Sequence, residues 1–176
     1  MKIIIIGYSG SGKSTLAKIL GDHYNIPVLH MDSIHFKPGW ETRNLEEFDS
    51  IVKEFMDNNV SWIIDGNYHR VAKERFSKAD QLIFLNYNPL TCLKNVIKRY
   101  KFYKHKTRPD MAFGCEEKID FEFIKWVIYK GRTKERKERL NSYALNHHNA
   151  LIFKNRRQLN NYLKENNIKY EIQKCL

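Results

Sequence analysis

The chain has 176 residues, of which 42% are hydrophobic, and it carries a net charge of +11. That is enough for one α/β domain with a packed core, which we expect to span residues 1–176. No apolar run approaches the length of a membrane span, and the three cysteines show no C-x-x-C spacing. This pattern excludes a membrane protein, a disulfide framework and a zinc site. The first residues enter a predicted strand and leave no room for a signal peptide, so we expect a cytoplasmic protein with reduced thiols.

Short apolar runs alternate with helical patterns along the chain. The predicted strands cover residues 2–6, 27–31, 61–66, 81–85 and 151–153. The predicted helices cover about 15–20, 45–55, 68–77, 89–100, 121–139 and 156–165. This alternation predicts a parallel sheet with helices on both faces, a three-layer α/β/α arrangement. Ligands of such sheets bind beyond the carboxyl ends of the strands.

Two of the predicted helices have recognisable starts. Asn44 can cap the helix that follows it, and Asn88-Pro89 places proline in a first turn. The apolar stripe of the first helix is predicted to be Leu45, Phe48, Val52 and Phe55. That of the second is predicted to be Leu90, Leu93, Ile97 and Tyr100. Between the predicted helices 89–100 and 121–139, residues 105–118 contain Pro109 and Gly114 and show no periodicity. We therefore expect a mobile, basic lid loop there.

The stretch Gly7–Ser14 reads GYSGSGKS and fits the spacing G-x-x-x-x-G-K-[ST] without a mismatch. Its glycines let successive backbone N–H groups point at one anion, and the following helix adds a partial positive charge. In this pattern the Lys13 side chain reaches the β- and γ-phosphates, and the Ser14 hydroxyl can bind Mg²⁺. A plain glycine turn is the alternative, but the flanking strand and helix favour a nucleoside triphosphate site. The predicted binding residues are Gly7, Ser9, Gly10, Ser11, Gly12, Lys13, Ser14 and Thr15.

Acidic residues follow the second and third strands. Asp32 can orient or deprotonate an acceptor hydroxyl, join the magnesium shell, or simply cap the next segment. Asp65 can hold Mg²⁺ or lie in a turn with Gly66. Further along, Arg43, Tyr68 and Arg70 could line an acceptor pocket, because arginine binds phosphate or carboxylate with two hydrogen bonds. The alternative is that Arg43 and Arg70 form surface ion pairs with Glu41, Glu46 or Glu74.

Arg132 has an independent geometric argument. On one continuous helix from Phe121 to about Arg139, the positions of Phe121, Ile128 and Arg132 lie within about 40° of one face. An arginine on an apolar face needs a partner, and a triphosphate is a natural one. If Gly131 ends the helix, Arg132 no longer lies on this face.

Several motifs together resemble the adenylate kinase-like P-loop kinases, and most closely the DNA topology modulation (FlaR)-related proteins. The shared pieces are Gly7–Thr15, Met31-Asp32, Pro38–Trp40, Trp62–Tyr68, Arg108–Met111 and Gly114–Glu116. The resemblance implies the strand order 2-3-1-4-5 and a magnesium role for Asp65. It also implies nucleotide-facing arginines near Arg99 and in the lid, where Arg108 lies. After Asp65-Gly66 the chain has Asn67–Arg70 where adenylate kinase has Phe-Pro-Arg, so AMP is not the expected acceptor.

The basic charge is concentrated in one segment. Residues 94–140 contain 15 Lys and Arg against 7 Asp and Glu, an excess of 8 positive charges. Such a segment can face nucleic acid, face the phosphates of a nucleotide, or be a solvated surface. The aromatic residues Tyr100, Phe102 and Tyr103 fit a core-facing helix as readily as a platform for stacked bases.

These observations predict an ATP- and Mg²⁺-dependent kinase that phosphorylates a small-molecule acceptor, with a nucleotide as one candidate. We expect a monomer or homodimer with no membrane partner. One alternative is a nucleotide-hydrolysing switch, although the chain lacks an Asn-Lys-x-Asp guanine-reading motif. The other is a nucleic-acid-associated ATP-binding protein that uses the basic segment.

Overall fold

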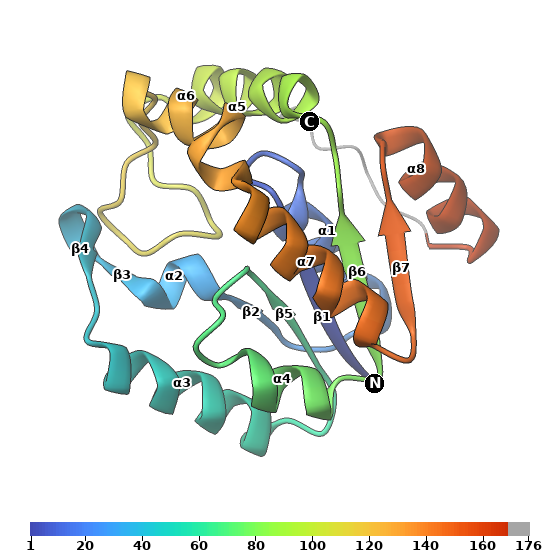
Figure 1. The fold of residues 1–176 in the computed structure, drawn as a ribbon. Helices are drawn as coiled ribbons and strands as arrows, with labels where there is room; N and C mark the ends of the chain where they lie inside the picture. The colour runs from blue at the N-terminus through green and yellow to red at the C-terminus, as the bar shows by residue number, and fades with distance from the viewer. Residues whose placement is uncertain (169–176) are drawn as a thin grey trace.

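The computed structural model describes residues 1–168, so the polar tail after them and Cys175 lie outside the described residues. Its centre is a five-stranded parallel sheet in the order β2-β5-β1-β6-β7 (Figure 1). The strands are β1 (Lys2–Gly7), β2 (Val28–His30), β5 (Trp62–Asp65), β6 (Gln81–Leu85) and β7 (Ala150–Phe153). Apart from two short hairpin strands that the sequence did not predict, this is the expected 2-3-1-4-5 order.

The central strand β1 is buried on both faces of the sheet. The four isoleucines Ile3–Ile6 of β1 are at most 1% exposed. Neighbouring strands flank β1 on both sides, and helices cover both faces of the sheet, so an unbroken β-branched run suits this position. The parallel register pairs Ile5 with Asp65 on one side and Gly7 with Leu85 on the other. The carboxyl ends of three central strands therefore meet at the glycine loop.

Helices form the two outer layers (Figure 1). One face carries α1 (Lys13–Tyr24) and α8 (Arg156–Glu165). The other face carries α3 (Leu45–Asn58), α4 (Ala72–Lys78) and α7 (Lys134–Asn146). Beyond the carboxyl ends of the strands lie α2 (Met31–His35), α5 (Pro89–Tyr103) and α6 (Phe121–Ile128). Within residues 1–168, no helix is both long and apolar enough to span a membrane.

The predicted helix starts are confirmed, but the predicted apolar stripes are partly wrong. Asn44 accepts from the amides of Glu46 and Glu47, and Asn88 accepts from that of Thr91. The buried residues of α3 are Phe48, Val52 and Met56, whereas Leu45 is half exposed. The buried residues of α5 are Cys92 and Val96, whereas Leu90 is exposed. Arg99 continues the inward-facing row of α5, because positions 92, 96 and 99 share one face of a helix.

The predicted single helix over residues 121–139 is wrong. The chain forms α6, a 3-10 turn η2 (Lys130–Arg132), and then α7, which is capped by the Thr133 side chain. A Cβ atom at Gly131 would lie 2.7 Å from the Trp126 carbonyl oxygen, so glycine permits this tight turn. Arg132 therefore does not share a helical face with Phe121 and Ile128.

The short hairpin and the predicted lid loop meet in space. The hairpin consists of β3 (Phe36–Lys37), the turn η1 (Pro38–Trp40) and β4 (Glu41–Thr42). In Figure 1 the loop after α5 reaches down toward this hairpin, and the Gly39 amide donates to the Gly114 carbonyl at 3.3 Å. The sequence suggested that nothing docks this loop, but Met111 and Cys115 are buried in it. The loop is therefore packed against the body of the protein.

Candidate active site

The loop between β1 and α1 has the backbone of a phosphate cradle. Gly10 and Gly12 have left-handed φ values of 80° and 91°, which are costly for residues that carry a Cβ atom. A Cβ atom at Gly10 would lie 2.4 Å from the Cys92 carbonyl oxygen of α5. Gly12 precedes α1 without any side-chain cap, so the positive end of α1 is left for an anion. The half-buried Lys13 folds back over the loop, with Nζ donating to the Tyr8 carbonyl at 3.2 Å.

Side chains from distant segments fix this loop. Asn67 accepts from the Gly7 amide at 3.0 Å and donates to the Gly7 carbonyl at 2.7 Å. Asn95 of α5 donates to the Gly10 carbonyl at 2.8 Å, and the Trp126 ring N–H donates to the Ser9 hydroxyl at 3.3 Å. None of these three residues had a predicted role. Asn67 lies in the segment after β5, and Asn95 and Trp126 lie on helices, where their residue types give no sequence signal that they support a loop elsewhere.

The loop opens into a cavity of about 1430 Å³, whereas a typical small-molecule site has about 300–1000 Å³. Its walls come from the loop itself, from the region of α2 with residues 66–69, and from α5, α6 and α7 with the lid loop. The predicted loop residues that line it are Ser9, Gly10, Gly12, Lys13, Ser14 and Thr15. Gly7 and Ser11 do not line it, because Gly7 bonds to Asn67 and the Ser11 side chain is buried inside the loop.

Asp32 and Tyr68 lie together on one wall of the cavity. The Tyr68 hydroxyl donates to Asp32 Oδ1 at 2.7 Å. Burial and the charge of Asp32 raise the pKa of Tyr68 well above its usual value, so the phenol remains a donor. The buried Arg75 guanidinium donates to the carbonyls of Gly66 and Tyr68 at 3.0 and 3.2 Å. The wall is thus held by an internal cation that the sequence did not single out.

Asp65 ends β5 beside β1, where the resemblance put it, but its carboxylate is taken. It is 4% exposed and bonds to His30 Nδ1 at 2.8 Å. Although burial lowers the pKa of His30, the hydrogen bond and charge of Asp65 raise it more, which favours a charged pair. His30 lines the cavity and Asp65 does not. The Asp65 carboxylate thus contacts His30 rather than the cavity, and its role in holding Mg²⁺, directly or through water, stays a prediction.

Mg²⁺ would neutralise charge between the β- and γ-phosphates of a bound nucleotide. Ser14 and Asp110 line the cavity and offer it one hydroxyl and one carboxylate. In residues 1–168 no three His, Cys, Asp or Glu side chains cluster closely enough to hold a metal by themselves. Mg²⁺ usually takes one or two carboxylates together with substrate phosphates and water, so these residues fit it.

Arg99 and Arg108 belong to one charged cluster on the cavity wall. Both bind the buried carboxylate of Glu117, at 2.7 and 2.6 Å. Arg108 also binds Asp110 at 2.6 Å. Burial alone would raise the pKa of Asp110, but the Arg108 charge and the Ser14 hydrogen bond lower it. The lid loop is therefore joined to α5 through ionised side chains.

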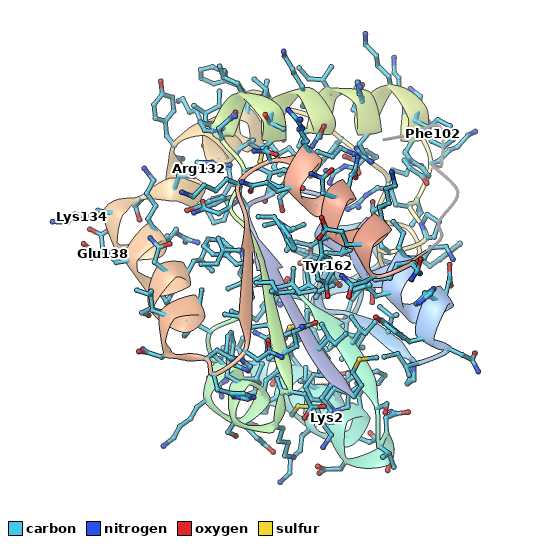
Figure 2. All side chains as sticks on the ribbon, turned by 90° about the vertical axis from the view of Figure 1, so that its right-hand side faces the viewer. Lys2, Phe102, Arg132, Lys134, Glu138 and Tyr162 are labelled. Carbon is cyan, nitrogen blue, oxygen red and sulfur yellow. The ribbon has the colours of Figure 1, made fainter. Side chains whose placement is uncertain are left out.

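Arg132 faces the protein interior and does not line the cavity. Its guanidinium donates to the carbonyls of Val127 and Tyr87 at 2.9 and 3.0 Å, and to Cys92 Sγ at 3.1 Å. It also lies 3.7 Å from the centroid of the Tyr8 ring. Figure 2 labels it where the chain enters α7, among side chains that point inward. The predicted contact with a triphosphate is thus replaced by a contact with the phosphate loop.

The predicted acceptor arginines also point elsewhere. Arg43 donates to the Ile34 carbonyl at 2.6 Å and pairs with Glu47. Arg70 pairs with Asp49 at 2.5 Å. Neither arginine lines the cavity, so both follow the surface-pairing alternative, with acids of α3 as partners. Arg136 and Arg139 of α7 line the cavity instead. They were not predicted, because no single arginine is distinguished from its neighbours in the highly charged run 130–139.

Comparison with known proteins supports the fold. No family model and no curated protein sequence matches the chain. Among solved structures, an uncharacterized protein from Eubacterium ventriosum is 18% identical, with a TM-score of 0.54 over 94% of this chain and 97% of that one. Shikimate kinase from Acinetobacter baumannii in complex with shikimate is 14% identical, with a TM-score of 0.54 over 96% and 95%. Shikimate kinase from Bacteroides thetaiotaomicron is 18% identical, with a TM-score of 0.50 over 94% and 95%.

The chain has the fold of the P-loop kinases. At these identities the likeness concerns the fold alone, so the chemistry must be argued from the side chains of the site.

Proposed function

We propose that this protein is an ATP- and Mg²⁺-dependent kinase that transfers the γ-phosphate to a hydroxyl of a small molecule. The observation that carries the proposal is the single cavity that runs from the phosphate loop to the wall with Asp32 and Tyr68. It exceeds the volume of a one-ligand site and so has room for a nucleotide and an acceptor together. The motif resemblance further supports a place among the FlaR-related kinases. The two free cysteines within residues 1–168 are buried, which supports a cytoplasmic location.

The residues divide the chemistry between them. The loop amides and Lys13 hold the β- and γ-phosphates, and Arg136 and Arg139 add positive charge from α7. The acceptor oxygen forms a bond to the γ-phosphorus while the bond from that phosphorus to the β–γ bridging oxygen breaks. Asp32 takes the hydroxyl proton and passes it to solvent, and ADP leaves. Packing of the lid loop over the cavity excludes water from the transferred group.

The basic segment needs no nucleic acid to explain it. Arg99, Arg108, Lys125 and Lys130 are all paired with acids. Lys134 and Glu138 point outward from α7 into solvent (Figure 2). Phe102 is half exposed rather than core-facing, and its ring packs edge-on against Tyr103. These features favour a solvated surface over a base-stacking platform.

The test is a screen for ATP-dependent phosphorylation of nucleosides, nucleotides and small hydroxy acids, with ADP release and labelled product both measured. Lys13→Ala is expected to abolish transfer while the far-UV spectrum stays native, because Lys13 is half-buried and bonds only to one loop carbonyl. Lys134→Ala, an exposed change on α7, is the matched control. Full transfer by Lys13→Ala would contradict the proposed role of the loop.

A further inference from the structure

One wall of the cavity is aromatic. His35, Phe36, Trp40 and Tyr68 are all half-buried and all line the cavity. Their rings form a continuous row, with centroid separations of 4.8 Å for Tyr68–His35, 4.7 Å for His35–Phe36 and 5.2 Å for Phe36–Trp40. The fully buried Phe48 packs behind both His35 and Tyr68. The row is therefore fixed from behind and presents ring surface to the cavity, which suits a planar ring in a ligand.

The same wall lacks a free cation. From residues 28–43 and 66–69, no lysine or arginine lines the cavity. Three flanking cations, Lys37, Arg43 and Arg70, are each paired with an acid of α3. The fully buried Arg75 donates to backbone carbonyls behind the wall and does not line the cavity. Lys118 lies over the Trp40 ring but does not line the cavity. Burial lowers the pKa of His35, so this ring is neutral at pH 7.

The charge that remains on this wall is negative. Asp32 is exposed to the cavity, and the Tyr68 phenol that donates to it is uncharged. His30 is paired with the buried Asp65 carboxylate, which balances positive charge on its ring. Above the wall, Arg108 is held between Asp110 and Glu117. An anionic acceptor would meet Asp32 without a compensating cation, and such like-charge contact costs binding energy.

We infer that the acceptor is an uncharged hydroxyl compound with a planar ring, the chemistry of a nucleoside, and that nucleoside monophosphates and hydroxy carboxylates are disfavoured. This inference rests on the proposed kinase function. In it, the ring stacks on the His35–Phe36–Trp40 row. The hydroxyl then donates to Asp32, beside the γ-phosphate at Lys13. The Phe36 and Trp40 rings are the specificity-determining contacts.

The test measures direct binding of matched pairs, each a nucleoside and its own 5′-monophosphate, to the full-length protein loaded with a non-hydrolysable ATP analogue and Mg²⁺. At least one nucleoside is expected to bind roughly tenfold or more tightly than its monophosphate, a difference of about 1.4 kcal/mol. Asp32→Asn is expected to reduce this preference to within about threefold, because it removes the repelling charge and keeps the shape. Arg43→Gln and Arg70→Gln are the matched controls and are expected to leave it unchanged.

The outcomes separate the two proposals. Tighter binding of the monophosphate in every pair, or loss of that binding in Arg43→Gln or Arg70→Gln, would overturn the inferred acceptor class while a kinase remained. Failure of every nucleoside to bind would overturn it as well. If a nucleoside binds with the expected preference but ATP then yields no phosphorylated product, the wall binds the inferred class of ligand but the kinase function fails.

Discussion

The Ser14 hydroxyl at the start of α1 helps to lower the pKa of Asp110, whose carboxylate is carried by the loop between α5 and α6. Ser14 is the residue that this loop motif offers to Mg²⁺. A carboxylate held there, with only part of its charge balanced by Arg108, occupies the side of the cradle that a nucleotide and its metal need. Two like unit charges about 8 Å apart repel by ~2 kcal/mol at an effective dielectric constant of about 20.

We therefore predict that Asp110→Asn tightens the binding of metal-free ATP by roughly tenfold. Titration calorimetry in the presence of EDTA measures this directly. Glu122→Gln, which removes one negative charge from the exposed face of α6, is the control and should leave the affinity unchanged. Weaker or equal binding by Asp110→Asn would show that the carboxylate does not oppose the phosphates.

Substitution of Arg132 should mainly lower stability, whereas substitution of Arg136 should mainly lower phosphoryl transfer. Arg132→Ala leaves two backbone carbonyls without their donor and should lower the free energy of unfolding by about 2–4 kcal/mol. Arg136 lies over the Trp126 ring on the cavity wall. Arg136→Ala should lower the free energy of unfolding by less than about 1 kcal/mol and reduce phosphoryl transfer about tenfold or more.

Urea denaturation and a transfer assay on both variants provide the check. Arg139→Ala is a second cavity-facing change and should behave like Arg136→Ala. An Arg132→Ala protein of native stability, or an unstable Arg136→Ala protein, would reverse the assignment.

The His30–Asp65 pair predicts a pH dependence of stability. The folded pKa of His30 is raised above its ordinary value of about 6.5, so the unfolded state loses its proton first as pH rises. The stabilisation is then fully present below about pH 6.5 and is lost as pH rises through the raised folded pKa.

Comparison of the wild type with His30→Asn isolates this contribution. At pH 6 the wild type should be more stable by about 1.5–3 kcal/mol, the range for a hydrogen bond to a charged group. At a pH above the folded pKa this difference should shrink. The measurement is urea denaturation of both proteins across the range, and a difference that grows with pH would contradict the pairing.

The basic surface predicts only weak nucleic-acid binding. In residues 94–140, Arg99, Arg108 and Lys130 are paired with acids. Lys134 on the outer face of α7 is exposed to solvent. Binding of duplex DNA should therefore be independent of sequence and disappear by about 150 mM salt, because released counterions drive it. Gel shifts at several salt concentrations measure this. A site-selective complex that survives at physiological salt would support the alternative function.

The sequence by itself determined the elements whose signals are local. The isoleucine run of β1, the order of strand, glycine loop and helix around Gly7–Ser14, the cap Asn44 and the helix start at Asn88-Pro89 were all predicted and confirmed. Each depends on steric or hydrogen-bonding preferences within a few residues, which any fold must respect. The motif resemblance supplied the strand order, which periodicity alone does not contain.

Only the tertiary structure decided which charged side chains face the cavity. Arg43 and Arg70 turned to acids of α3, Arg132 turned inward to Tyr8, and Asp65 turned to His30. Arg136, Arg139 and Asp110 took places on the cavity wall instead. The physical reason is that a long charged side chain reaches several partners around its backbone position. Its choice depends on acids and carbonyls brought near by distant segments, and no local pattern records them.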